Sequence, residues 1–306
     1  MKFIKYTLLS ALLIFTLLFM VGCDTEHDTP VTSPYYGGIH GLEAEFERVG
    51  RVSDTGERAS VWEDESFPLA VRLRNKGEFT IPSHEVEMNI KGIAKNDFSG
   101  IDFHKTNDEE IDKVSQFMPD GGTLFVDFGN AKYNYLEGTH YDANIYLEYT
   151  YPYETYINIP RVCYKYDIRD DSVCTVDSRR QAFASGGPIR IREVKQSYIG
   201  RSNMMLEIEI ENLGGGRAKA HKSDSFSSDW DEVFFRVGDT DWACESHGTS
   251  DSNVARMHRT GDKKATIRCT NDNLEKDALY TRAITLTLEY YYRDKVSQTV
   301  RIKEVP

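Results

Sequence analysis

Basic side chains are scarce in this chain of 306 residues: 37 lysines and arginines stand against 49 aspartates and glutamates. Binding along a nucleic-acid backbone needs clustered lysine and arginine, so we expect no nucleic-acid partner. Proline is also infrequent, with 9 residues, whereas hydrophobic residues make up 40% of the chain. That is enough apolar material for real cores, which argues against a wholly disordered protein, and the length suits two ordinary domains.

Motifs that carry chemistry are missing as well. The sequence has no GxSxG segment, the pattern of a nucleophile elbow, and no HExxH segment, the pattern of a zinc peptidase. It has no CxxC pair and its histidines are scattered, which argues against a thiolate metal site. The acidic clusters around Asp231 and Asp241 lack the spacing of a calcium-binding loop. We therefore expect no enzyme activity, no bound metal and no cofactor.

The N-terminus predicts export. Two lysines among the first five residues precede an apolar run that ends in Met20-Val21-Gly22-Cys23, and this order is typical of a secretory signal. The last four residues resemble the lipobox of prokaryotic lipoproteins. The resemblance implies a signal peptide over residues 1–22, a lipid such as palmitate on Cys23, and a protein anchored extracytoplasmically to the cell membrane. The alternative is an uncleaved signal anchor.

A tether is predicted next, over residues 23–38. From Asp24 to Gly38 the chain is polar, with two prolines, two glycines and no apolar period. Such a composition is typical of a flexible linker.

Beyond residue 38 the dominant hydrophobic period is two. Alternating segments lie at residues 42–46, 67–73, 86–90, 124–128, 204–210, 233–237 and 265–267. Alternation places one set of side chains in a core and the other in water. Many short segments of this kind, separated by polar turns, predict an all-β fold of antiparallel sandwiches.

The chain also repeats itself. Alternating positions from Tyr141 to Tyr153 are matched by positions from Tyr280 to Tyr292, at an offset of 139 residues. Earlier, Leu73-Arg74-Asn75-Lys76-Gly77 is echoed by Ile210-Glu211-Asn212-Leu213-Gly214, at an offset of 137. A period this long indicates a duplicated domain rather than a solenoid.

Two segments carry a family resemblance. Leu136-Glu137-Gly138-Thr139-His140-Tyr141 is similar to the tyrosine-corner segment of fibronectin type III and other immunoglobulin-like domains. The passage Phe67–Ile90 resembles adhesion-related immunoglobulin-like modules of prokaryotic surface proteins. The resemblance implies two tandem immunoglobulin-like β-sandwiches, over residues 39–185 and 186–306, after the signal helix and the tether.

Four cysteines remain if Cys23 carries a lipid. An even number in an oxidising compartment favours two disulfides, and four cysteines allow three connectivities. Closeness in the chain favours Cys163–Cys174 and Cys244–Cys269.

Tyrosine is abundant, with 18 residues. In a strand, Tyr149, Tyr151 and Tyr153 share one face, which predicts a place in the core. Tyr291 faces the opposite way from its neighbours, and Trp230 lies in an acidic cluster. These two residues are the candidates for contact with a sugar ring.

These observations predict a non-enzymatic, membrane-anchored surface lipoprotein that acts as a binding, adhesion or spacer module of the cell envelope. Its partner would be a protein or glycan of the envelope. The alternative function is carbohydrate binding through exposed aromatic residues. A third hypothesis is an extracytoplasmic hydrolase whose site is assembled from distant acids.

The acidic excess is confined to one part of the chain. Residues 23–187 hold 30 acidic and 16 basic side chains, whereas residues 188–306 hold 19 of each. An acidic membrane-proximal domain would be repelled by anionic lipid headgroups. A cationic partner is the other explanation for the excess.

Overall fold

The structure is a computed structural model that describes residues 31–49, 59–134, 138–176, 178–200, 203–248, 251, 253–272 and 274–305. The chain divides into two units, Met1–Thr32 and Ser33–Pro306, and every strand of the described residues lies in the second unit, the body. The predicted signal peptide and Cys23 lie outside the described residues. Every regular element within the described ranges is a β-strand, which confirms the all-β fold class. No helix that could span a membrane is present in them.

Two of the three sheets are wholly antiparallel. The four-stranded sheet has the order β1-β3-β7-β5, with β1 (Leu42–Phe46), β3 (Phe67–Asn75), β7 (Thr123–Tyr133) and β5 (Phe98–Ile101). The five-stranded sheet has the order β15-β17-β12-β11-β9, with β15 (Ala243–Ser246), β17 (Lys264–Asn271), β12 (Met204–Asn212), β11 (Ile189–Tyr198) and β9 (Ser178–Arg180).

The third sheet has nine strands and joins the other two. Its main path is β16-β14-β18-β8-β4-β6, with β16 (Val254–His258), β14 (Trp230–Val237), β18 (Leu279–Lys303), β8 (His140–Lys165), β4 (Glu87–Lys91) and β6 (His104–Thr106). Three short strands are added to it: β10 (Phe183–Ala184) pairs with β8, while β13 (Arg217–Lys219) and β2 (Ser60–Trp62) pair with β18. Only the β2 pairing is parallel within the described part of this sheet.

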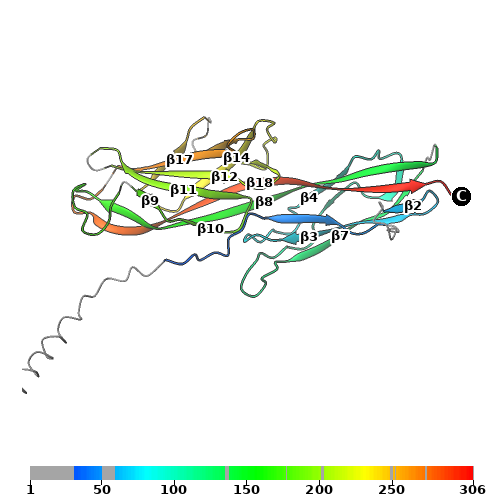
Figure 1. The fold of residues 1–306 in the computed structure, drawn as a ribbon, viewed down its shortest axis with the longest axis horizontal. Coiled ribbons are helices and arrows are strands. Elements are labelled where there is room, and N and C mark those ends of the chain that lie inside the picture. Colours follow the sequence, from blue (N-terminus) through cyan, green and yellow to red (C-terminus); the bar gives the residue numbers. More distant parts are fainter. Residues whose placement is uncertain are drawn as a thin grey trace, which may run out of the picture. The chain divides into compact units, whose positions relative to one another are not determined.

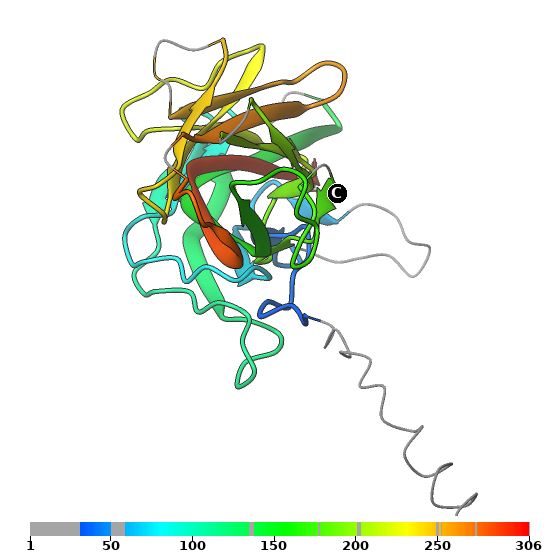
Figure 2. The same ribbon diagram turned by 90° about the vertical axis from the view of Figure 1, so that its left-hand side faces the viewer.

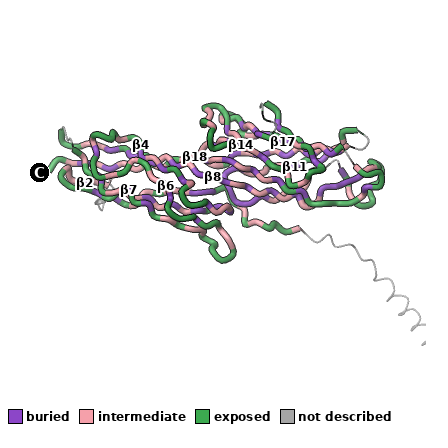
Figure 3. The backbone as a smooth tube through the Cα atoms, turned by 180° about the vertical axis from the view of Figure 1, so that it is seen from behind, coloured by how far each residue is buried: buried purple, intermediate pink, exposed green. Residues whose placement is uncertain are grey.

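The predicted alternation matches the burial of the strands. In β3 the buried hydrophobic positions are Phe67, Leu69, Val71 and Leu73, and in β12 they are Met204, Leu206, Ile208 and Ile210. The residues between them are more exposed, and buried positions recur in the same way along β8 and β18 (Figure 3). Along these strands, therefore, one face is turned to the core and the other is more exposed to solvent.

Two long strands run side by side through the body (Figure 1). β8 has 26 residues and β18 has 25, and they pair from Lys165 with Leu279 to His140 with Lys303. The end of β8 and the start of β18 face the viewer in Figure 2. The ladder between them is the longest in the body.

Each long strand belongs to both halves of the body. The N-terminal half consists of β1–β7 together with residues 140–150 of β8 and residues 293–303 of β18. The C-terminal half consists of the other strands and the rest of β8 and β18. β4 pairs with the first part of β8, and β14 pairs with the first part of β18. β8 thus begins in the N-terminal half and ends in the C-terminal half, and β18 runs the opposite way. Residues on both sides of the boundary predicted between residues 185 and 186 therefore contribute strands to each half. That division itself stays a prediction.

The sequence repeat coincides with the symmetry of this ladder. Tyr151 pairs with Tyr292, and Tyr153 pairs with Tyr290. The repeat makes Tyr151 equivalent to Tyr290 and Tyr153 equivalent to Tyr292, because each of these couples is 139 residues apart. If every tyrosine is replaced by its equivalent, the Tyr151–Tyr292 pair becomes the Tyr153–Tyr290 pair. The centre of this exchange is the pair of Pro152 and Tyr291. The order of the main sheet is symmetric about the same point, because β14 flanks β18 as β4 flanks β8.

Pro152 sits at an open edge of β8. On the edge away from β18, β4 pairs with residues 146–150 and β10 pairs with residues 157 and 158. Between them the described residues place no strand beside Pro152. A proline has no amide hydrogen to donate, so a strand accepts it most readily at such a position.

Five buried tyrosines line the core where the halves meet, and their hydroxyl groups are hydrogen-bonded; they are Tyr149, Tyr151, Tyr153, Tyr290 and Tyr292. The Tyr153 hydroxyl donates to the carbonyl of Gly186 at 2.6 Å. The Tyr292 hydroxyl donates to Asn212 Oδ1 at 3.1 Å and accepts from the amide of Gly216 at 2.9 Å. A buried phenol is stable only with such partners, so these bonds tie the ladder to the turns around it.

We expect alkaline unfolding to coincide with ionisation of these five tyrosines. Burial raises the pKa of every one of them above the ordinary value of 10. Because the folded state keeps the phenols neutral, their contribution to stability is complete below pH 10 and is lost as the pH rises through the raised pKa values. Ultraviolet absorbance of tyrosinate should therefore rise in two steps, the second together with loss of the circular-dichroism signal.

The urea-unfolded protein is the control, since all its tyrosines should ionise in one step near pH 10. A single step in the folded protein, with its circular dichroism intact, would contradict this prediction.

Candidate functional site

The structure contains two disulfides, as the cysteine count predicts. They join Cys163 to Cys174 and Cys244 to Cys269, the pairing that closeness in the chain favours. Cys244 and Cys269 lie directly opposite each other on β15 and β17. Disulfides persist in oxidising compartments, so their presence agrees with an extracytoplasmic protein.

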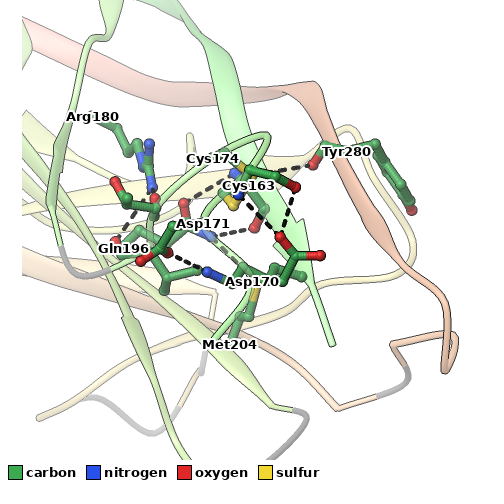
Figure 4. Close-up of a disulfide and its surroundings, with 12 residues drawn as sticks. Cys163, Asp170, Asp171, Cys174, Arg180, Gln196, Met204 and Tyr280 are labelled. Carbon is green, nitrogen blue, oxygen red and sulfur yellow. Dashed lines mark hydrogen bonds and ion pairs between the residues drawn. A yellow bond between two sulfur atoms is a disulfide. The ribbon is translucent and has the colours of Figure 1, made fainter. Parts of the chain in front are cut away.

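The Cys163–Cys174 disulfide lies beside a network of hydrogen bonds and an ion pair (Figure 4). The side chain of buried Gln196, on β11, donates to the Cys163 carbonyl at 2.6 Å and accepts from the Cys163 amide at 3.1 Å. The buried ammonium group of Lys165 pairs with Asp171 in the loop that the disulfide closes. The Gln196 side chain therefore joins the end of β8 to the five-stranded sheet beside the disulfide.

Trp230 and Tyr291 both lie on the nine-stranded sheet but in different surroundings. Trp230 is 37% exposed and packs edge-on against its cross-strand neighbour His258, with ring centroids 4.7 Å apart. Tyr291 is half-buried, and the ammonium group of its cross-strand neighbour Lys219 lies 5.6 Å from the ring centroid. The described residues show no ring contact between Trp230 and Tyr291.

Three residues that the sequence did not indicate form a group of ring and cation contacts with Tyr291. The ring of Phe226 lies 5.1 Å from Lys219 Nζ and 3.9 Å from the Arg293 guanidinium carbon. Tyr291, Phe226, Lys219 and Arg293 thus form one group of alternating rings and cations, which we call the aromatic–cation cluster. Aromatic faces and cations attract each other, by about 1 kcal/mol at exposed sites. Phe226 lies in a loop without periodicity, so the sequence offered no signal for it.

Lys219 is hydrogen-bonded to the loop that carries Phe226. Its ammonium group donates to the carbonyls of Lys222 at 2.7 Å and Asp224 at 2.8 Å. Burial, and then the charge of Arg293, lower the pKa of Lys219. Tyr291 and Phe226 are both half-buried, so part of each ring remains accessible for stacking against a polar ring such as a sugar.

A basic cleft lies beside the cluster. Its volume is about 340 Å³, and its lining includes Arg217, Arg259, Arg293 and Lys295 with the acids Glu148 and Asp294. Arg217 stands directly opposite Arg293 in the ladder between β13 and β18, a like-charge pair that is unfavourable by itself. Glu148 offsets part of this charge at 3.7 Å from Arg293.

In the described ranges, no group of three or more His, Cys, Asp or Glu side chains is placed to hold a metal ion.

The fold and these surfaces define an all-β, disulfide-bonded protein with predominantly antiparallel sheets. No protein-family model matches the chain, and no curated protein sequence matches it. Among solved structures the chain is similar to the secreted serine protease VesC from Vibrio cholerae, at 14% identity and a TM-score of 0.23. The similarity covers 80% of this chain and 49% of that one, so the chain spans about half the length of that protein. A score this low does not establish a common fold.

Proposed function

We propose that this chain is a non-enzymatic lipoprotein, anchored outside the cytoplasm through Cys23, that binds or spaces another component of the cell envelope. In this proposal each half of the body is an immunoglobulin-like sandwich. The partner is a protein or a glycan of the envelope.

The continuous ladder of β8 and β18 is the observation that supports the proposal best. Two domains joined by a linker move relative to each other by default. Here two strands, β8 and β18, each run from one half into the other, and they are hydrogen-bonded to each other across the junction. Bending at the junction would break backbone hydrogen bonds and expose the buried tyrosines. Such a body is suited to hold a binding surface at a constant distance from an anchor.

Palmitate labelling of cells that express the protein tests the anchor. The wild type and a Thr25→Ala control should incorporate label, and Cys23→Ala should incorporate none. Equal labelling of Cys23→Ala and the wild type would rule out lipidation at this residue.

Carbohydrate binding is the second candidate, supported by the aromatic–cation cluster and by the exposure of Trp230. A peptidoglycan pull-down should retain the wild type and lose Tyr291→Ala or Trp230→Ala. Phe125→Ala is the matched control, because Phe125 is an exposed ring on the four-stranded sheet. Binding that survives both the Tyr291 and the Trp230 substitution would reject this candidate.

A further inference from the structure

Three arginines and three aromatic residues line a cavity of about 460 Å³ in the C-terminal half. The cavity lies between the segment of residues 33–37 and the strands β9, β10 and β11, and these six residues are Arg180, Arg190, Arg192, Tyr35, Tyr36 and Phe183. It is separate from the aromatic–cation cluster, with which it shares no residue. We call it the arginine cavity.

A buried carboxylate holds one wall of this cavity in place. Glu78 is 9% exposed and accepts hydrogen bonds from the amides of Tyr36 at 3.1 Å, Gly37 at 2.8 Å and Gly186 at 2.6 Å. The C-terminal end of the predicted tether is therefore bound to the body. Tyr36 takes part in a formed site rather than in a free linker.

The arginine cavity has more positive charge than its own acids neutralise. Glu193 is the one acid among the described lining residues, and its carboxylate already pairs with Arg179 and with Lys195. Arg192 pairs with Glu209, at 3.0 Å between Nη1 and Oε1.

The other two arginines have no acidic partner in the described part of the chain. Arg180 donates Nη2 to the carbonyls of Thr175 and Val176, which carry no net charge. Arg190 pairs with Glu211 through the backbone ladder of β11 and β12, but its guanidinium group makes no hydrogen bond or ion pair with a described side chain. Among the described residues, therefore, no carboxylate lies within ion-pair distance of either of these two guanidinium groups.

Burial makes this imbalance costly. The Nε atoms of Arg180 and Arg190 are buried and have no acceptor, and burial lowers the pKa of Arg180. A partly desolvated cation without an anion is unfavourable, and a buried donor without an acceptor adds to the cost. An anion that enters the cavity would supply the missing counter-charge.

We propose that the arginine cavity binds a phosphate group. A phosphate monoester near neutral pH carries about two negative charges, which matches the two guanidinium groups that lack an acidic partner among the described residues. Its oxygens accept the forked hydrogen bonds that arginine donates. The rings of Tyr35, Tyr36 and Phe183 provide an apolar wall for the organic group that bears the phosphate. This inference goes beyond the proposed envelope function and does not require the lipid anchor.

Calorimetric titration of the full chain in a nonionic detergent tests the proposal, with inorganic phosphate as one probe and glycerophosphoglycerol as the other. We expect the wild type to bind at least one of them. Arg190→Gln and Arg180→Gln should each weaken binding about tenfold or more, the effect of losing one charged hydrogen-bonding partner. Arg217→Gln, in the basic cleft, is the control and should leave the affinity unchanged.

The two probes distinguish the sources of the phosphate. Tighter binding of glycerophosphoglycerol indicates a lipid headgroup, whereas tighter binding of inorganic phosphate indicates a soluble phosphate compound. The proposal is overturned if the wild type binds neither probe at concentrations on the order of 10 mM. It is also overturned if Arg217→Gln abolishes binding that Arg190→Gln and Arg180→Gln retain. Circular dichroism of each variant checks that it is folded.

Discussion

Deletion of residues 297–306 should unfold the N-terminal half of the body. These residues include the end of β18, which pairs with the start of β8 and with β2. Val300 and Ile302 are buried in the core, and Arg301 forms a two-pronged ion pair with Asp142 at 2.7 and 2.9 Å. Two buried aliphatic side chains and the lost ladder bonds together cost about 5 kcal/mol or more. That is comparable with the whole stability of a domain.

Hydrogen exchange is the measurement for this deletion. Amide protection should be lost in β3 and β7 and retained in β12 and β17, although the deleted residues lie at the far end of the chain. Deletion of residues 305 and 306, which keeps β18 and the hydrogen bond from the Glu304 amide to the Thr139 carbonyl, is the control and should leave protection unchanged. Two independent tandem domains would give the opposite result, because the deletion would then remove protection from residues 186–306. Loss of protection confined to β12 and β17 would therefore contradict the exchange of strands between the halves.

Replacing either of two equivalent glycines by alanine should destabilise the protein by about 3 kcal/mol or more, because the added carbon overpacks a core. A Cβ at Gly77 would lie 1.7 Å from the Tyr153 hydroxyl and 2.8 Å from the His40 carbonyl. A Cβ at Gly214 would lie 2.0 Å from the Tyr292 hydroxyl. Each tyrosine would have to move, and each would strain or lose its hydroxyl hydrogen bond. Thermal unfolding should show a fall in Tm of about 10 °C.

Gly215→Ala is the control within the same turn. No atom lies within 4 Å of a Cβ at Gly215, so its Tm should stay at the wild-type value. The double substitution of Gly77→Ala with Tyr153→Phe should regain part of the loss, since it removes the closest atom. A Gly77→Ala protein that melts like the wild type would show that the turn can move away from Tyr153.

The equivalence of these glycines could be predicted from the sequence. Each follows an asparagine by two positions, and in each turn the asparagine Oδ1 accepts the glycine amide hydrogen, at 3.1 Å for Asn75 and 3.0 Å for Asn212. This contact is local, within three residues, so a short repeated motif carries it. The tyrosine that presses against each glycine is distant in the chain, and no local pattern indicates it.

The candidate sites show the same limit. The alternating pattern by itself predicted that Tyr291 faces away from the core. It could not predict the neighbours of Tyr291, because Phe226 comes from a loop and Arg293 from the continuation of the strand. The arginine cavity brings the segment of residues 33–37 against Arg180 and Arg190, which are separated from it by most of the N-terminal half. The sequence showed no reason to join them, because an arginine without a partner is recognised only when its surroundings are known.

The amino-acid sequence by itself determined the all-β class, the faces that the alternating strands bury, the even set of cysteines and the internal repeat. Those properties depend on side-chain period and composition, which act over a few residues. Only the tertiary structure decided that β8 and β18 continue from one half into the other. A strand that turns back within its half and one that runs on can have the same alternating pattern. The choice depends on which distant strand completes the hydrogen-bond ladder.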